Sequence, residues 1–170
     1  MYEDWNVERW ETPVSDAKSL FMVSLIDEGG LAITLQEARD PLPRRFCFTF
    51  SNYPAYRNIL EEYRTELWQR LNNAQNKLGW TLIVRDSPWI AVFRKTEPLL
   101  EVFNPNPIHY MICTEDDVIE VLSSKPPEIR GIEPKNQRES VGKSQVYYHP
   151  QDKEHIEKII KKIKEKQTRK

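Results

Sequence analysis

Three apolar stretches in the first 50 residues have the pattern of consecutive β-strands. Residues 20–26 and 31–35 are rich in apolar and β-branched side chains, and the segment between them ends in two glycines that suit a tight hairpin turn. Residues 44–50 alternate strictly, with three phenylalanines on one side of the segment. We therefore predict an antiparallel three-stranded meander.

The next stretch has a helical pattern. From Tyr56 to Leu78, apolar residues recur every three or four positions, which is the spacing of one helix face. Ser51 or Asn52 offers an N-terminal cap, and Gly79 suits the stop. We predict one long amphipathic helix over about residues 53–78, lying across the sheet.

The following 45 residues predict shorter elements. Residues 80–84 and 109–113 read as strands, and between them Ser87-Pro88 opens a helix that Pro98 interrupts. Residues 114–124 fit two structures. The β-branched content favours a hairpin with a strand over 118–123, and the alternative is a short helix whose first turn begins at Thr114.

These elements give an α+β fold class. We expect a mostly antiparallel sheet of about five or six strands, packed against one long amphipathic helix and a shorter one, with a basic C-terminal helix in addition. The predicted organisation is a single α+β domain over 1–133, a polar linker over 134–150 and a Lys-rich amphipathic tail helix over 151–170. An isoleucine stripe gives the tail helix its apolar side.

Charge is balanced overall but is unevenly distributed. Lys and Arg number 25 against 26 Asp and Glu, a net charge of −1 that creates no global attraction for nucleic acid or an anionic membrane. Residues 151–170 hold eight basic and four acidic side chains, a net of +4, which leaves −5 for the rest. Without a signal sequence or a long apolar run, we expect a soluble, cytoplasmic protein that does not enter membranes.

Motifs that would indicate catalysis are incomplete. Gly142-Lys143-Ser144 resembles the end of a phosphate-binding loop, but Gln137 stands where that loop needs a glycine. His109 and Cys113 would lie on one face of a strand, roughly 13 Å apart, which is too far for proton transfer. Zinc ligands lack the usual spacing; the available side chains are Cys47, His109, Cys113, His149 and His155. We expect no catalytic residue, metal or cofactor.

Aromatic residues beside acidic ones suggest a surface for a protein partner, because exposed tryptophans with complementary charge are typical of binding hot spots. The candidate partner-binding residues are Trp5, Trp10, Trp68, Glu61, Glu62, Asp116 and Asp117. Further candidate contacts lie in the basic tail, at Lys158, Lys161, Lys162 and Lys164.

The sequence therefore favours a small non-enzymatic protein-binding module, such as an inhibitor of the antitoxin or immunity type with an acidic, Trp-bearing surface. Its expected partner is a protein of unspecified identity. One alternative is an enzyme whose acidic residues and His109 converge in a cleft between the sheet and the helix near residues 87–103. A second alternative is nucleic-acid binding through the basic tail. It is less favoured because four acids are mixed into the tail and no aromatic residue lies beyond Tyr148.

Overall fold

The computed structural model describes residues 6–38, 43–73 and 78–132. The predicted linker over 134–150 and the predicted tail helix over 151–170 lie outside the described residues. In chain order the elements are β1 (Asn6–Arg9), β2 (Leu20–Asp27), β3 (Leu31–Glu37), β4 (Arg44–Phe50), β5 (Ala55–Leu60), the 3-10 turn η1 (Glu61–Tyr63), α1 (Thr65–Asn73), β6 (Thr81–Arg85), α2 (Pro88–Thr96), α3 (Leu100–Phe103), β7 (Ile108–Cys113), β8 (Asp117–Ser123) and β9 (Glu128–Ile132).

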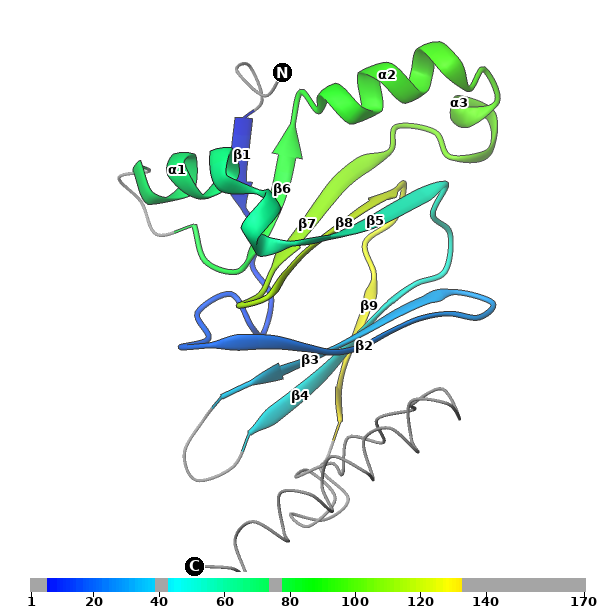
Figure 1. Ribbon diagram of the computed structural model, residues 1–170. Helices are drawn as coiled ribbons and strands as arrows, with labels where there is room; N and C mark the ends of the chain where they lie inside the picture. Colours follow the sequence, from blue (N-terminus) through cyan, green and yellow to red (C-terminus); the bar gives the residue numbers. More distant parts are fainter. Residues whose placement is uncertain (1–5, 39–42, 74–77, 133–170) are drawn as a thin grey trace, which may run out of the picture. The chain divides into compact units, whose positions relative to one another are not determined.

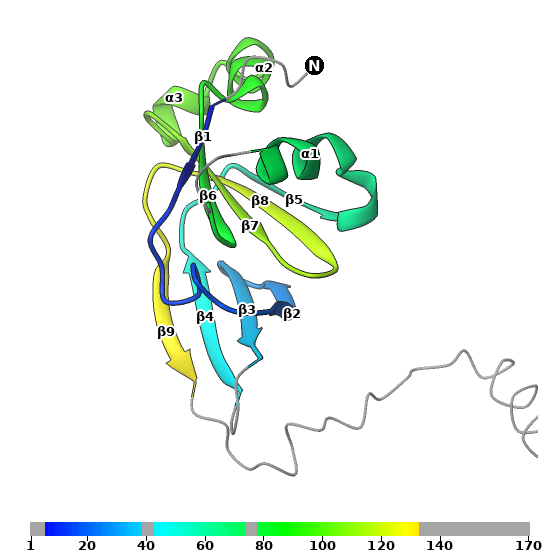
Figure 2. The ribbon, with the colours of Figure 1, turned by 90° about the vertical axis from the view of Figure 1, so that its left-hand side faces the viewer.

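The described strands form two antiparallel sheets (Figures 1 and 2). One has the strand order β1-β6-β7-β8-β5, and the other has the order β2-β3-β4-β9. The α+β class is confirmed, with sheet as the dominant content, and so is the β2-β3-β4 meander. The expectation of one sheet with five or six strands is wrong, because the nine strands of the described residues divide between two sheets.

The two sheets pack face to face. The main core cluster takes Leu31, Ile33 and Leu35 from β3, and Tyr110 and Ile112 from β7. Alternate side chains of β7 therefore point toward the four-stranded sheet, while its remaining positions point to the opposite face. The α1 and α2 helices lie over that opposite face (Figure 1).

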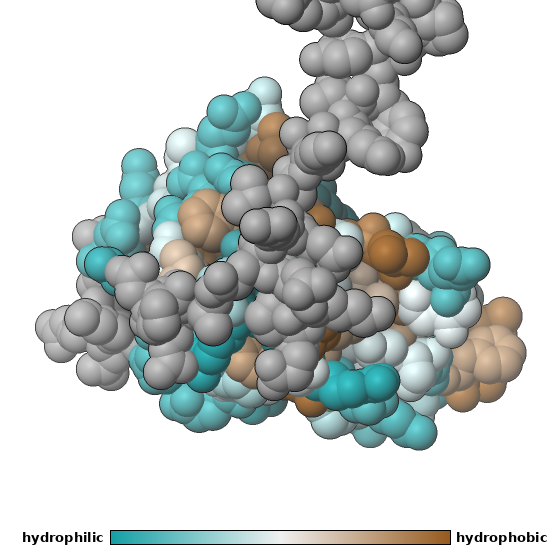
Figure 3. Space-filling model, turned by 90° about the horizontal axis from the view of Figure 1, so that it is seen from below, coloured by the Kyte–Doolittle hydropathy of each residue, from teal (hydrophilic) through white to brown (hydrophobic). Residues whose placement is uncertain are grey.

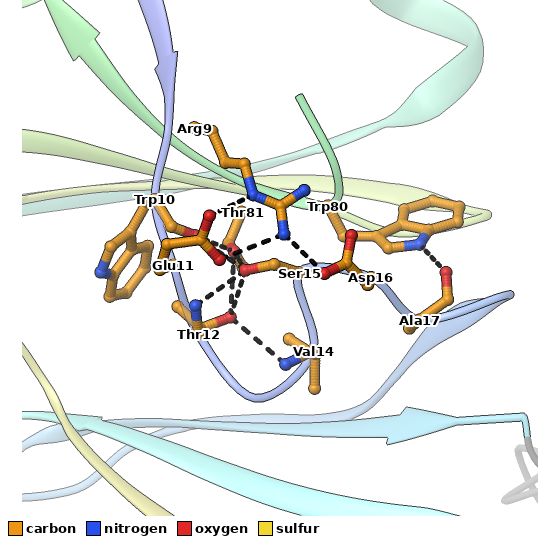
Figure 4. Close-up of polar contacts among 10 residues, drawn as sticks. All are labelled: Arg9, Trp10, Glu11, Thr12, Val14, Ser15, Asp16, Ala17, Trp80 and Thr81. Carbon is orange, nitrogen blue, oxygen red and sulfur yellow. Dashed lines mark hydrogen bonds and ion pairs between the residues drawn. The ribbon is translucent and has the colours of Figure 1, made fainter. Parts of the chain in front are cut away.

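The connection between β1 and β2 joins the two layers through a dense polar network (Figure 4). The Ser15 hydroxyl lies 2.9 Å from the Thr81 hydroxyl and 2.7 Å from the Thr12 backbone nitrogen, whose hydrogen it accepts. The Trp80 indole donates a 2.6 Å hydrogen bond to the backbone oxygen of Ala17. Because these buried polar groups have partners, the loop can lie in the core without an unpaired donor or acceptor at these atoms.

On its outer face the four-stranded sheet carries polar and apolar side chains in the same rows. The cross-strand row Phe21–Gln36–Arg45–Ile132 has an apolar residue at each end and polar residues between them. The view from this side accordingly shows hydrophilic and hydrophobic residues intermixed (Figure 3). Among the described residues, the exposed apolar side chains of this sheet are Phe21, Val23 and Ile26 of β2 and Ile132 of β9.

The predicted helix over 53–78 is wrong in its first half, where β5 stands instead. Backbone pairing with β8 explains the difference, since Tyr56 aligns with Val121 and packs against the core between the sheets. The helix α1 begins only at Thr65, after η1. Its Leu67 and Trp68 pack over the outer face of the five-stranded sheet, as the helical stripe predicted for that part of the chain.

Three local predictions are confirmed. Ser87 caps α2, its hydroxyl accepting the Ile90 backbone N–H, and the helix ends at Thr96, before Pro98. The segment 114–124 is a hairpin rather than a helix, because β7 and β8 pair across it and the Thr114 hydroxyl accepts the Asp117 N–H. Besides β5, two further strands were not predicted: β1 and β9 have only four and five residues, too short for a clear alternating pattern.

Candidate functional site

A single carboxylate lies at the centre of the five-stranded sheet. Glu120 is fully buried on β8, opposite Arg57 of β5 on one side and Met111 of β7 on the other. Its side chain is on the outer face, with Met111 and His109. A charged group in this position needs partners, because desolvation of an isolated carboxylate is very costly.

Two arginines and a histidine surround Glu120. Arg57 donates from Nε and Nη2 at 2.6 and 2.9 Å, a bidentate contact, and Arg64 donates from Nη2 at 2.9 Å. The Nε2 atom of His109 lies 3.2 Å from Glu120 Oε1, within ion-pair distance but without the alignment of a hydrogen bond. The guanidinium of Arg57 also stacks over Trp89 of α2, 4.4 Å from the ring centroid.

These contacts determine the protonation states. Burial alone would raise the pKa of Glu120, but its close contacts with His109 and Arg57 outweigh burial and lower that pKa to about 2. Burial lowers the pKa of His109, and its contact with Glu120 only partly offsets this. At neutral pH, Glu120 is therefore ionised and His109 is neutral.

Ser87 completes the network from the start of α2. Its hydroxyl lies 2.8 Å from His109 Nδ1 and also accepts the Ile90 N–H. An ionised Glu120 favours the proton of His109 on Nε2, so Nδ1 accepts the hydroxyl proton of Ser87. Ser87 and His109 also line a pocket of about 420 Å³ between β6, β7 and α2, together with Arg85, Ile90 and Arg94.

Ser87, His109 and Glu120 are arranged as a nucleophile, a base and an orienting acid would be. The charges around them oppose this chemistry. Arg57 and Arg64 place two positive charges beside the single negative charge of Glu120. These two positive charges disfavour a protonated His109 and lower its pKa, whereas the mechanism would require an imidazolium to form there. The network is thus better suited to fixing α1, α2 and β5 on the sheet than to moving a proton.

The thiol of Cys113, which sequence analysis placed on the same strand face as His109, does not offer a nucleophile either. Cys113 is buried, and burial raises the pKa of its thiol to about 12, so it stays protonated at neutral pH. Among the residues that the structure describes, no group of three His, Cys, Asp or Glu side chains is placed to hold a metal ion. His149 and His155 lie outside that part of the chain.

A second polar region lies at one end of β5 and β8, and it gathers most of the predicted partner-binding residues. The backbone N–H of Glu61 donates to the Asp116 carbonyl at 2.9 Å, which brings the acidic pairs 61–62 and 116–117 together. Two large apolar side chains beside them are largely exposed to solvent, Leu60 at 52% and Tyr63 at 72%. We name this surface the acidic end; it comprises Leu60, Glu61, Glu62, Tyr63, Asp116 and Asp117.

The other predicted site residues lie elsewhere. Trp68 is half-buried on α1, and its indole N–H donates a 3.3 Å hydrogen bond to the Glu61 carbonyl. This bond links α1 to the acidic end. Trp10 packs in the core, its ring centroid 4.9 Å from that of Tyr110. Outside the described residues lie Trp5, Lys158, Lys161, Lys162 and Lys164.

The sequence analysis identified His109 but not the residues it meets. The pairing of β7 with β8 places Nε2 of His109 3.2 Å from Oε1 of Glu120, although the two residues are eleven positions apart in the sequence. One signal was present: Glu120 is the only charge inside the apolar run from Val118 to Leu122, and a buried charge implies a partner.

Comparison with known proteins adds no functional assignment. No family model, curated protein or solved structure matches the chain. Within the described residues, no helix has the length and apolar character needed to cross a membrane.

Proposed function

We propose that this chain is a non-enzymatic protein-binding module whose acidic end docks on a basic surface of another protein. In this proposal it acts in the cytoplasm as an inhibitor of the antitoxin or immunity type, masking a basic functional surface of its partner. The observation that carries the proposal is the convergence of two acidic pairs with exposed Leu60 and Tyr63.

The composition of the acidic end supports this function. Exposed Tyr63 offers a large rigid contact, and tyrosine is enriched among residues that dominate binding energy. Glu62 and Asp116 are exposed around it and give the surface one sign of charge, which favours rapid encounter with a basic partner. Trp68 and the Glu61–Asp116 backbone bond hold the surface in place, so little ordering is needed on binding.

Copurification with matched charge reversals tests the proposal. The tagged full chain, expressed in its native host, should retain a stoichiometric basic protein at low salt and lose it as salt rises. The double variant Glu62→Lys/Asp116→Lys should release that protein. The control Glu28→Lys/Glu97→Lys changes the net charge equally at two other exposed sites and should retain it. A clean chain without a partner, or equal loss in both variants, would contradict the proposal.

A second candidate function, an enzyme of the hydrolase type, is favoured by one observation. The Ser87 hydroxyl lies 2.8 Å from His109 Nδ1, and both residues line the same pocket. The test is covalent labelling by a fluorophosphonate probe, which reports an activated serine. Labelling that disappears in Ser87→Ala would establish a nucleophile. The charge balance around His109 leads us to expect no labelling.

A further inference from the structure

The pocket between β6, β7 and α2 has the size and the lining of a small-molecule site. Its volume of about 420 Å³ lies within the range of roughly 300 to 1,000 Å³ that is typical of ligand pockets. Two of its polar side chains are almost fully buried, Ser87 at 5% and His109 at 2% exposure. They bond to each other, so they give the pocket an inner wall that is polar but uncharged at neutral pH.

The rest of the lining combines an apolar surface with charged groups. The apolar residues of the lining are Val84, Ile90, Ala91, Pro107 and Ile108. A hydrocarbon group placed against them is removed from water, which is favourable in proportion to the apolar area buried. The charged residues are Arg85 of β6, Arg94 of α2 and Asp86 between these elements, so positive charge exceeds negative charge by one. The lining therefore favours a ligand with an apolar body and a negative charge.

Both arginines have partners in the structure, and these are partners that a ligand can replace. Arg85 pairs with Glu8, and Arg94 pairs with Glu101. All four side chains are between 44% and 52% exposed, and ion pairs in such contact with solvent contribute little to stability. Neither glutamate lines the pocket. A carboxylate that enters the pocket can therefore take over the guanidinium of Arg85, because Glu8 can turn to water.

We propose that this pocket binds a small carboxylic acid with an apolar body. The carboxylate pairs with Arg85 and Arg94, and the apolar body packs against Ile90, Ala91 and Ile108. Binding involves no covalent step. The inference does not depend on the functions proposed above, because it requires neither an activated serine nor the acidic end. The pocket includes the first two residues of β7, whereas the acidic end includes the turn that follows β7.

An NMR titration of the isotope-labelled full chain with phenylacetate tests the proposal. We expect saturable shifts at backbone amides that line the pocket, such as those of Ser87, Ala91 and Ile108, with a dissociation constant of about 1 mM or below. Phenylacetamide has the same apolar body without the charge, so it should bind at least about tenfold more weakly. The absence of saturable shifts up to about 10 mM phenylacetate would overturn the proposal, as would equal binding of phenylacetamide.

Matched charge variants test the role of Arg85. Arg85→Gln should weaken phenylacetate binding by at least about fivefold, because one of the two guanidiniums is lost. Glu8→Gln should strengthen binding by about two- to fivefold, because it removes the glutamate that competes for the same guanidinium. The controls Arg130→Gln and Glu128→Gln make the same changes in an exposed ion pair of the other sheet and should leave the dissociation constant unchanged.

A steric variant tests the location of the apolar body. Ala91 is exposed and lines the pocket, so Ala91→Trp should fill the pocket without disturbing the core and should abolish the saturable shifts. Circular dichroism checks that each variant is folded. An Ala91→Trp variant that binds phenylacetate as the wild type does would contradict the proposal. So would an Arg85→Gln variant with unchanged affinity, or a Glu8→Gln variant that binds no more tightly than Glu128→Gln.

Discussion

Replacement of Glu120 by glutamine is the sharpest test of the buried network. The substitution keeps the size of the side chain and one carbonyl acceptor but removes the charge that faces Arg57 and Arg64. The side chain of Arg64 is only 6% exposed, so it cannot turn to water without moving α1. The variant therefore removes the negative charge that Arg64 contacts at 2.9 Å inside the protein.

The expected loss of stability follows from the protonation of Glu120. A carboxyl group whose pKa falls from 4.5 to about 2 on folding gains about 3 kcal/mol from its native contacts. Removal of one partner from a buried ion pair costs about 3 to 5 kcal/mol, in agreement with that figure. Because the native pKa is the lower one, this stabilisation is present above pH 4.5 and is lost as the pH falls toward 2.

Urea unfolding at neutral pH measures the effect. The free energy of unfolding of Glu120→Gln should fall by about 3 kcal/mol, a midpoint shift of roughly 1 to 2 M. The control is Glu8→Gln, which removes an exposed partner of Arg85 in the same sheet and should cost less than about 1 kcal/mol. In Arg64→Met/Glu120→Leu the buried guanidinium that contacts Glu120 is removed together with the carboxylate, so the double variant should be more stable than Glu120→Leu. A Glu120→Gln variant as stable as Glu8→Gln would refute this reasoning.

Three further predictions concern single residues. Gly79→Ala should destabilise the fold by more than about 2 kcal/mol in a urea titration, because Gly79 has φ +77° and an added Cβ would clash with the backbone oxygen of Ser15 in the β1–β2 connection. Gly29 has a similar φ of +66° but open space around it, so the control Gly29→Ala should cost only about 1 to 2 kcal/mol. In the native protein a thiol reagent should modify Cys47 before Cys113, whose buried thiol has a pKa raised to about 12 and should react only on unfolding; early labelling of Cys113 would contradict its placement. Because burial lowers the pKa of His109 in the folded state, stability should decline as the pH drops below about 6.5, and His109→Gln should flatten that decline when unfolding is followed between pH 7 and 5.

Local features of the sequence determined much of the secondary structure. The hairpin of β2 and β3, the alternation in β4 and the cap at Ser87 each depend on residues close together in the chain. Backbone geometry and side-chain period therefore sufficed to predict them. The same kind of evidence predicted exposed acidic pairs and the apolar stripe of α1, but not where these surfaces would meet.

Only the tertiary structure decided the remainder, because it depends on pairing between distant strands. The segment Ala55–Leu60 has apolar positions that fit a helix, and backbone bonds to β8, some sixty residues away, make it a strand. That same register places Arg57 beside Glu120, while β7 pairing brings His109 to it. Periodicity describes one segment at a time, so it could not reveal a network assembled from β5, β7, β8 and the starts of α1 and α2.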